Sequence, residues 1–230
     1  MRIEGVKSAK REGVERKVGL FGGTFNPIHL GHLRGAEEIR EALGLEEVIF
    51  IPASIPPHKA AEEVIDARHR LEMVKLATED NPFFSTTDIE LARPHKSYSI
   101  DTIRYFRERH PEGLFFILGS DAFVEIETWR EFQNLFALCN FIVMTRPEFQ
   151  KTMPSSPVPK SLASLFRYEK EGKAWVHRSG HTLHFKEITV LDISSTKIRE
   201  LIEKGESIRY LVPGKVEGYV RDHELYRTLR

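Results

Sequence analysis

Short apolar segments alternate with longer amphipathic segments along most of this sequence. The apolar segments predict strands at 18–21, 47–51, 114–118 and 141–144, with a further strand within 84–91. Apolar residues at helical spacing predict helices at 33–43, 66–79 with Asp66 as its cap, 99–109, 121–138 with a break near Trp129, and 215–229. This alternation is typical of an α/β, Rossmann-like parallel sheet with helices on both faces, followed here by C-terminal helices.

The alternation lapses over residues 147–187, which we interpret as an insertion made of an irregular loop and a hairpin. Clustered prolines predict the loop at 153–159, and two apolar runs around a glycine predict the hairpin at 174–185. The three histidines of the hairpin do not indicate a metal site, because opposed strands would scatter them and no cysteine or carboxylate completes a ligand set. We assign this segment no chemistry.

The composition suits one globular domain. The chain has 230 residues, of which 40% are hydrophobic and 30% charged, so we expect a single domain over 17–230. Residues 1–16 are mixed in charge and lack an apolar core, which predicts a flexible extension rather than a signal peptide or a membrane anchor.

Charge and cysteine content exclude several kinds of partner. Lys+Arg and Asp+Glu each total 34, so no overall field favours nucleic acid or an anionic membrane. The single cysteine, Cys139, lies in an apolar run and cannot form an intrachain disulfide. We expect a buried structural cysteine in a protein of the reducing cytoplasm.

The segment between the first predicted strand and its helix has the chemistry of a phosphate site. It reads G-G-T-F-N-P-I-H-L-G-H over residues 22–32. Glycines let a backbone approach an anion closely, and a helix N-terminus offers unpaired N–H groups. His29 and His32 stand three residues apart, so both imidazoles can lie on one side of the first helical turn and reach one polyphosphate.

This motif resembles the signature of the nucleotidyltransferases that share an H-x-G-H element with class I aminoacyl-tRNA synthetases. Within them it is most similar to the bacterial nicotinate mononucleotide adenylyltransferases. The segment I-S-S-T-K-I-R at 193–199 resembles the second phosphate motif of that superfamily, so the resemblance runs from about residue 17 to the C-terminal helix. It implies the nucleotidyltransferase type of Rossmann-like fold.

The resemblance implies adenylyl transfer from ATP to nicotinate mononucleotide, which gives nicotinate adenine dinucleotide and pyrophosphate in NAD biosynthesis. Mg²⁺ is the implied cofactor, held mainly by the ATP phosphates. His29, His32 and Arg199 are the implied catalytic contacts to those phosphates. The implied ATP-binding residues are Gly22, Gly23, Thr24, Phe25, Gly119, Asp121, Ser194, Ser195 and Thr196. From the residues alone, Ser194 and Asp121 serve equally well as simple helix caps.

Other matching elements imply the mononucleotide site. They are P-P-H-K, S-Y-S-x-x-T, T-W and R-P, although Glu148 stands where the family has glycine after R-P. The implied contacts are His58, Lys59, Tyr98, Ser99, Trp129 and Arg146. The tryptophan would stack on the pyridine ring, and its structural alternative is ordinary packing.

Several other activities remain to be weighed. The sequence has no G-x-x-x-x-G-K-[ST] and no G-x-G-x-x-G after the first strand, which disfavours a P-loop enzyme and a dinucleotide redox enzyme. Adenylyl transfer to nicotinamide mononucleotide or to phosphopantetheine uses the same phosphate chemistry. A nucleotide-binding protein without turnover is the alternative from another class.

Overall fold

Strands and helices alternate as the pattern predicts. The computed structural model describes residues 16–55, 64–93, 96–111, 113–147, 149 and 156–227. The strands are β1 (Val18–Gly23), β2 (Glu47–Pro52), β3 (Phe84–Thr86), β4 (Leu114–Gly119), β5 (Asn140–Thr145), β6 (Phe166–Glu169), β7 (Ala174–His177) and β8 (Thr182–Glu187). The helices are α1 (Leu30–Leu43), α2 (Ala67–Thr78), α3 (Ser99–Arg107), α4 (Ser120–Val124), η2 (Ile126–Thr128), α5 (Phe132–Leu135), η3 (Lys160–Leu165), α7 (Ser195–Glu203) and α8 (Gly214–Asp222).

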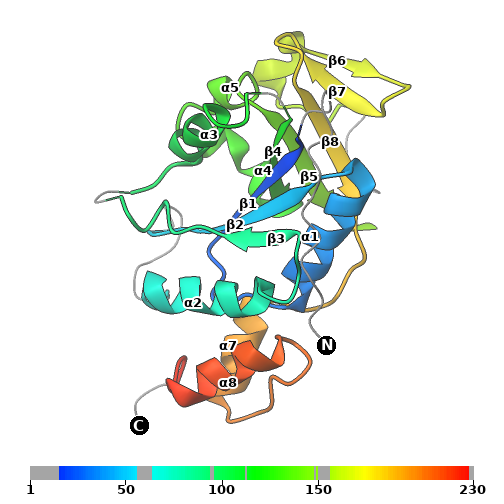
Figure 1. Ribbon diagram of the computed structural model, residues 1–230. Helices are drawn as coiled ribbons and strands as arrows, with labels where there is room; N and C mark the ends of the chain where they lie inside the picture. Colours follow the sequence, from blue (N-terminus) through cyan, green and yellow to red (C-terminus); the bar gives the residue numbers. More distant parts are fainter. Residues whose placement is uncertain are drawn as a thin grey trace, which may run out of the picture.

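The strands form one sheet in the order β3-β2-β1-β4-β5-β8-β7-β6 (Figure 1). The first six strands of that order run parallel, and β7 and β6 are antiparallel to their neighbours. The chain moves outward from β1 to β2 and β3, then returns to the other side of β1 with β4. The carboxyl ends of β1 and β4 therefore form the switch point at which open α/β sheets bind ligands.

Two hydrophobic cores cover the two faces of the sheet, and strict alternation along the strands divides residues between them. On β4, Leu114, Phe116 and Leu118 belong to the core that contains α3, whereas Phe115 and Ile117 belong to the core that contains α1 and α2. The side-chain period of a strand is two, so strands that are apolar at every position need cover on both faces. Helices supply it, with α7 and α8 packed below α2 (Figure 1).

The predicted elements are confirmed with shifts at their ends. Asp66 caps α2, its Oδ1 accepting from the Arg68 N–H at 2.7 Å. The predicted helix at 121–138 breaks at Trp129, as expected, and consists of the short helices α4, η2 and α5. Within 84–91 only β3 is a strand, and the last helix, α8, ends at Asp222 rather than at 229. Cys139 is buried, at 1% exposure.

Residues 156–187 are more regular than the sequence indicated, and the first part of the loop predicted at 153–159 lies outside the described residues. The predicted hairpin is present as β7 and β8, but β8 also pairs in parallel with β5, and β6 adds a third strand at the edge. The hairpin thus continues the main sheet. His177 and His184 bond to the hydroxyls of Ser179 and Thr182, and the described residues contain no group of three or more potential metal ligands.

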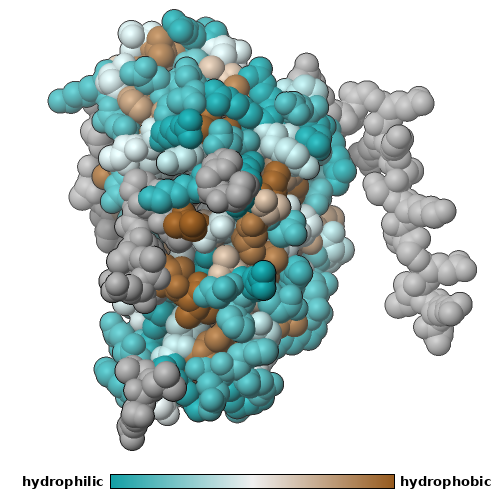
Figure 2. All heavy atoms as spheres, turned by 90° about the vertical axis from the view of Figure 1, so that its left-hand side faces the viewer, coloured by the Kyte–Doolittle hydropathy of each residue, from teal (hydrophilic) through white to brown (hydrophobic). Residues whose placement is uncertain are grey.

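No helix in the described part of the chain is long and apolar enough to cross a membrane. Figure 2 shows the side of the molecule on which α2 and α3 lie. Hydrophobic side chains gather over the middle of this face, and hydrophilic side chains surround them.

The buried side chain of Arg70, on α2, joins the connection after β1 to the connection after β2. It is only 1% exposed. Its guanidinium donates to the carbonyl oxygens of Ile65 at 3.1 Å, Thr24 at 2.8 Å and Ser54 at 2.9 Å. Thr24 and Ser54 follow β1 and β2, so this one cation ties together the carboxyl ends of neighbouring strands.

We expect Arg70→Ala to lower the free energy of unfolding by about 3 kcal/mol, because three partly buried carbonyl oxygens lose a charged donor. Urea denaturation measures the change. Arg68→Ala is the matched control, since Arg68 is an exposed arginine on the same helix and alanine keeps the N–H that Asp66 caps. Equal stability of the two variants would contradict this role for Arg70.

Candidate active site

Two adjoining cavities lie at the switch point between β1 and β4. The indole cavity, which contains Trp129, has a volume of about 370 Å³. The imidazole cavity, which contains His29 and His32, has a volume of about 380 Å³. Gly22, Gly23 and Gly119 line both cavities, so two ligands bound in them would meet above these glycines.

Glycine keeps this meeting point open. A Cβ added to Gly119 would find no atom within 4 Å, so it would project into empty space above the strand end. A Cβ on Gly22 would lie 3.5 Å from the ring of Phe116. The absence of side chains at Gly22 and Gly119 therefore leaves the backbone accessible from both cavities.

His29 and His32 form a stacked pair at the start of α1. Their ring centroids are 3.7 Å apart with an interplanar angle of 26°. The N–H of His29, the N-cap residue, donates to Nδ1 of His32 at 3.2 Å. Since Nδ1 accepts this bond, a neutral His32 carries its proton on Nε2. The fold thus selects the tautomer and orientation of the His32 ring.

His29 is the more buried of the two, at 7% exposure. Burial and the nearby Arg146 guanidinium lower the pKa of His29 to about 4. Its Nδ1 has no hydrogen-bond partner among the described residues. The ring is therefore neutral at pH 7, and an anion placed beside it would favour its protonated form.

The surroundings of Gly31 explain why the H-x-G-H element has a glycine at this position. A Cβ at this position would lie 3.1 Å from Nδ1 and 3.2 Å from Cε1 of His29, closer than ordinary packing. A larger residue at 31 would displace the imidazole.

A second helix start faces the same cavity. Ser194 caps α7, its Oγ accepting from the Lys197 N–H at 3.1 Å, and Ser194, Ser195 and Thr196 all line the imidazole cavity. Ser195 also donates from Oγ to the carbonyl oxygen of Pro27 at 2.9 Å. The N-termini of α1 and α7 thus converge on one space, an arrangement that attracts phosphate. Ser194 is both a helix cap and a cavity residue.

The remaining predicted ATP contacts divide between the two cavities. Phe25 and Asp121 line the imidazole cavity, and Thr24 lines the indole cavity. Asp121 is in the first turn of α4, but the N-cap of that helix is Gly119. Arg199 lines neither cavity. Its Nη1 donates to the carbonyl oxygen of Asn26 at 3.0 Å, so the structure shows it holding the loop before α1.

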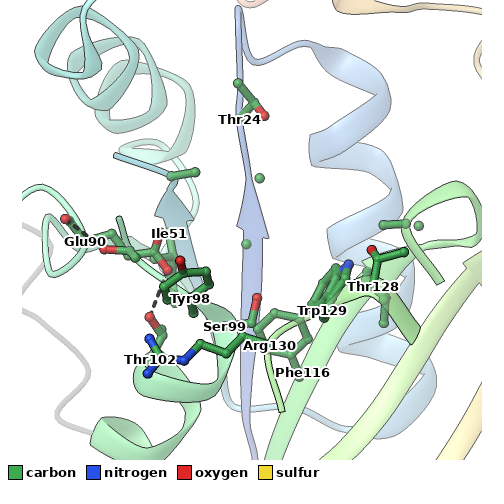
Figure 3. Close-up of a pocket in the computed structure, with 17 residues that line it drawn as sticks. Thr24, Ile51, Glu90, Tyr98, Ser99, Thr102, Phe116, Thr128, Trp129 and Arg130 are labelled. Atoms are coloured by element: carbon green, nitrogen blue, oxygen red, sulfur yellow. Dashed lines mark hydrogen bonds between the residues drawn. The ribbon is translucent and has the colours of Figure 1, made fainter. Parts of the chain in front are cut away.

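Aromatic side chains line the indole cavity. Trp129 lies edge-to-face with Phe116, at a centroid distance of 6.1 Å, and Tyr98 lies across the cavity from it (Figure 3). The guanidinium of Arg130 sits 4.8 Å from the ring centroid of Tyr98. Ser99, the first residue of α3, completes this side.

Sequence reasoning missed a polar group in this cavity. Glu90 is 8% exposed, and burial raises the pKa of its carboxyl group. Its Oε1 accepts from the Thr102 hydroxyl at 2.8 Å (Figure 3). That hydroxyl accepts in turn from Arg93 at 2.9 Å. No local pattern marked Glu90, whereas Arg130 directly follows the T-W element and could have been found there.

Of the residues assigned to the mononucleotide by resemblance, one is placed differently and two are not described. Arg146 lines the imidazole cavity instead of the cavity that contains Trp129. His58 and Lys59 lie outside the residues that the structure describes.

Comparison with known proteins identifies the family. The sequence model of the cytidylyltransferase-like family matches residues 20–201. A probable nicotinate-nucleotide adenylyltransferase of Pelobacter propionicus is 46% identical over 211 residues, covering 91% of this chain and 98% of the relative. The chain belongs to the nicotinate-nucleotide adenylyltransferase family. A second such relative, from Citrifermentans bemidjiense, is 46% identical over 93% of this chain and its own full length.

The Rossmann-like fold of this nicotinate-nucleotide adenylyltransferase family member recurs in distant solved structures. Plasmodium falciparum nicotinic acid mononucleotide adenylyltransferase, complexed with NaAD, aligns with a TM-score of 0.69 at 19% identity, over 92% of this chain and 98% of that one. The same protein complexed with APC aligns with a TM-score of 0.68. This likeness confirms the predicted α/β architecture.

We expect His29 to titrate with a midpoint near pH 4, measured by NMR on its Cε1–H, and His29→Asn assigns the signal. A His pKa lowered from about 6.5 means that the unfolded chain binds the proton first, so this group reduces stability as pH falls from about 6.5 to 4.

Pyrophosphate should raise the midpoint, because a bound anion favours imidazolium. A free-state midpoint near 6.5, or one that pyrophosphate does not move, would contradict the assignment of this ring to a phosphate site.

Proposed function

We propose that this chain transfers the adenylyl group of ATP to nicotinate mononucleotide, releasing pyrophosphate and forming nicotinate adenine dinucleotide. The observation that carries the proposal is the adjoining pair of cavities. One has two imidazoles and two helix N-termini for a polyphosphate, the other has an indole for a flat ring, and they share Gly22, Gly23 and Gly119. The names of the relatives select nicotinate as the acceptor.

The reaction needs positioning more than proton transfer. An oxygen of the mononucleotide phosphate attacks the α-phosphorus of ATP, the bond from that phosphorus to the bridging oxygen breaks, and pyrophosphate leaves with the electron pair. The attacking phosphate is largely dianionic at neutral pH, so it needs no general base. Aligning two bound reactants supplies roughly 7–11 kcal/mol of the barrier.

Hydrogen-bond donors of the imidazole cavity stabilise the negative charge on the leaving pyrophosphate. His32 donates from Nε2, His29 gains a proton or donates as a neutral ring, and the N–H groups at the starts of α1 and α7 add fixed donors. Such preorganised donors each contribute roughly 2.7–4 kcal/mol. A direct contact of Arg199 with phosphate stays a prediction, as do the mononucleotide contacts of His58, Lys59 and Arg146.

Mg²⁺ enters this proposal as part of the ATP complex. The described residues hold no group of three or more potential ligands, and Asp121 is the one carboxylate among the residues that line the imidazole cavity. This donor set fits an ion that is bound mainly by phosphate oxygens and water. Its chemistry would be to neutralise phosphate charge.

The indole cavity supports a pyridine carboxylate. Trp129 can stack on an electron-poor ring, and the start of α3 at Ser99 together with Arg130 provides positive potential beside it.

We also propose a cytoplasmic location, since the lone, buried Cys139 suits a reducing compartment.

Pyrophosphate release from MgATP should be fastest with nicotinate mononucleotide when nicotinamide mononucleotide and phosphopantetheine are offered separately. Faster release with either of the others would move the specificity while keeping the chemistry. ATP binding without release for any acceptor would contradict enzymatic function and favour a nucleotide-binding protein.

His32→Asn should lower kcat by about 10²–10³, the scale for a lost transition-state donor. Asparagine can still accept the His29 N–H through Oδ1, so the melting temperature should stay nearly unchanged. His69→Asn is the control, because His69 bonds to Tyr219 and lies outside both cavities. Wild-type kcat in His32→Asn would refute the assigned role.

A further inference from the structure

The loop between β1 and α1, residues 24–29, is fixed by hydrogen bonds from groups that are distant in sequence. Arg70 donates to the carbonyl oxygen of Thr24, Arg199 to that of Asn26 and Ser195 to that of Pro27. The N–H of Leu30, at the start of α1, donates to the carbonyl oxygen of Leu211 at 3.0 Å. The loop that ends in His29 therefore takes its shape from contacts with α2, α7 and the segment before α8.

The C-terminal segment adds a contact to a side chain of this loop. Tyr226, beyond the end of α8, donates from its hydroxyl to Oδ1 of Asn26 at 2.9 Å. The two residues are 200 positions apart. Asn26 is 2% exposed, so without Tyr226 this bond to a buried acceptor is lost.

The backbone on either side of Leu225 adopts positive φ angles. Glu224 has φ 49° and Tyr226 has φ 62°, in the left-handed region that residues other than glycine rarely occupy. Leu225 between them is 9% exposed and its N–H bonds to the carbonyl oxygen of Val220 at 3.0 Å. Such conformations persist where surrounding contacts over-determine them.

The guanidinium groups of Arg70 and Arg199 lie near the Tyr226 hydroxyl. Burial raises the pKa of this hydroxyl, and the two guanidinium groups oppose that shift. Both also bond to the loop itself. The Tyr226 hydroxyl and the two guanidinium groups are therefore hydrogen-bond donors to the same loop, which ends in His29.

We propose that Tyr226 is a positioning residue of the ATP site, which acts through Asn26 to hold the loop that ends in His29. Tyr226 then contributes to the phosphate site indirectly, although it lines neither cavity. This inference rests on the proposed adenylyl transfer, because it assigns the loop to ATP.

Tyr226→Phe removes only the hydroxyl and tests the inference. We expect KM for MgATP to rise roughly tenfold, the scale of one hydrogen bond lost from a buried acceptor, while KM for nicotinate mononucleotide stays unchanged. The matched control is Tyr219→Phe. That hydroxyl bonds to His69 at 2.9 Å in the same C-terminal region but does not reach the loop, so both KM values should match the wild type.

Two readouts separate positioning from general stability. The Cε1–H signal of His29 should shift in Tyr226→Phe and not in Tyr219→Phe. In an Asn26→Ala background, Tyr226→Phe should have no further effect on KM for MgATP, because the two residues act as one unit.

The outcomes are distinct from those of the proposed function. An unchanged KM for MgATP in Tyr226→Phe, an equal rise in both KM values, or additive effects in the double variant would overturn the inference. If the wild type turns over no acceptor, the proposed function fails, and calorimetric binding of MgATP decides instead. Equal dissociation constants for the wild type and Tyr226→Phe would then overturn the inference.

Discussion

The hydrogen bonds that bind the carbonyl oxygens of the loop between β1 and α1 are the constraint on which both cavities depend. Arg70 of α2 and Ser195 and Arg199 of α7 each donate to one of these oxygens. With its carbonyls turned toward the protein, the loop can place His29 at the start of α1 and leave Gly22 and Gly23 uncovered between the cavities. Buried carbonyls need donors, so the loop and its supports form together.

The electrostatics of the two cavities follow from this geometry. Burial keeps His29 neutral in the free protein, and the stacked His32 has its tautomer selected by a main-chain donor. Helix N-termini provide positive potential without buried cations that would repel one another. An arriving polyphosphate can then recruit charge onto His29. The indole cavity needs shape more than charge, and Trp129, Phe116 and Tyr98 supply it.

The positions of β1, β2, β4 and β5 could be predicted because each of these strands has an apolar run and therefore has to be buried on both faces. The edge strand β6 could not be predicted, since Arg167 and Glu169 give it no apolar run and its pairing partner is another strand, β7. The pairing of β8 with β5 is likewise absent from any local pattern. The same limit applies to Glu90, whose partner Thr102 belongs to another element.

The order of elements, the glycine turn with its two histidines and the second helix start at Ser194 can all be predicted from the sequence, because each is set by neighbouring residues. Three features can be known only from the folded chain: Arg146 lines the imidazole cavity, Arg199 bonds to Asn26, and Tyr226 bonds to the same residue from beyond α8. These contacts join elements whose separation in sequence carries no information about their separation in space.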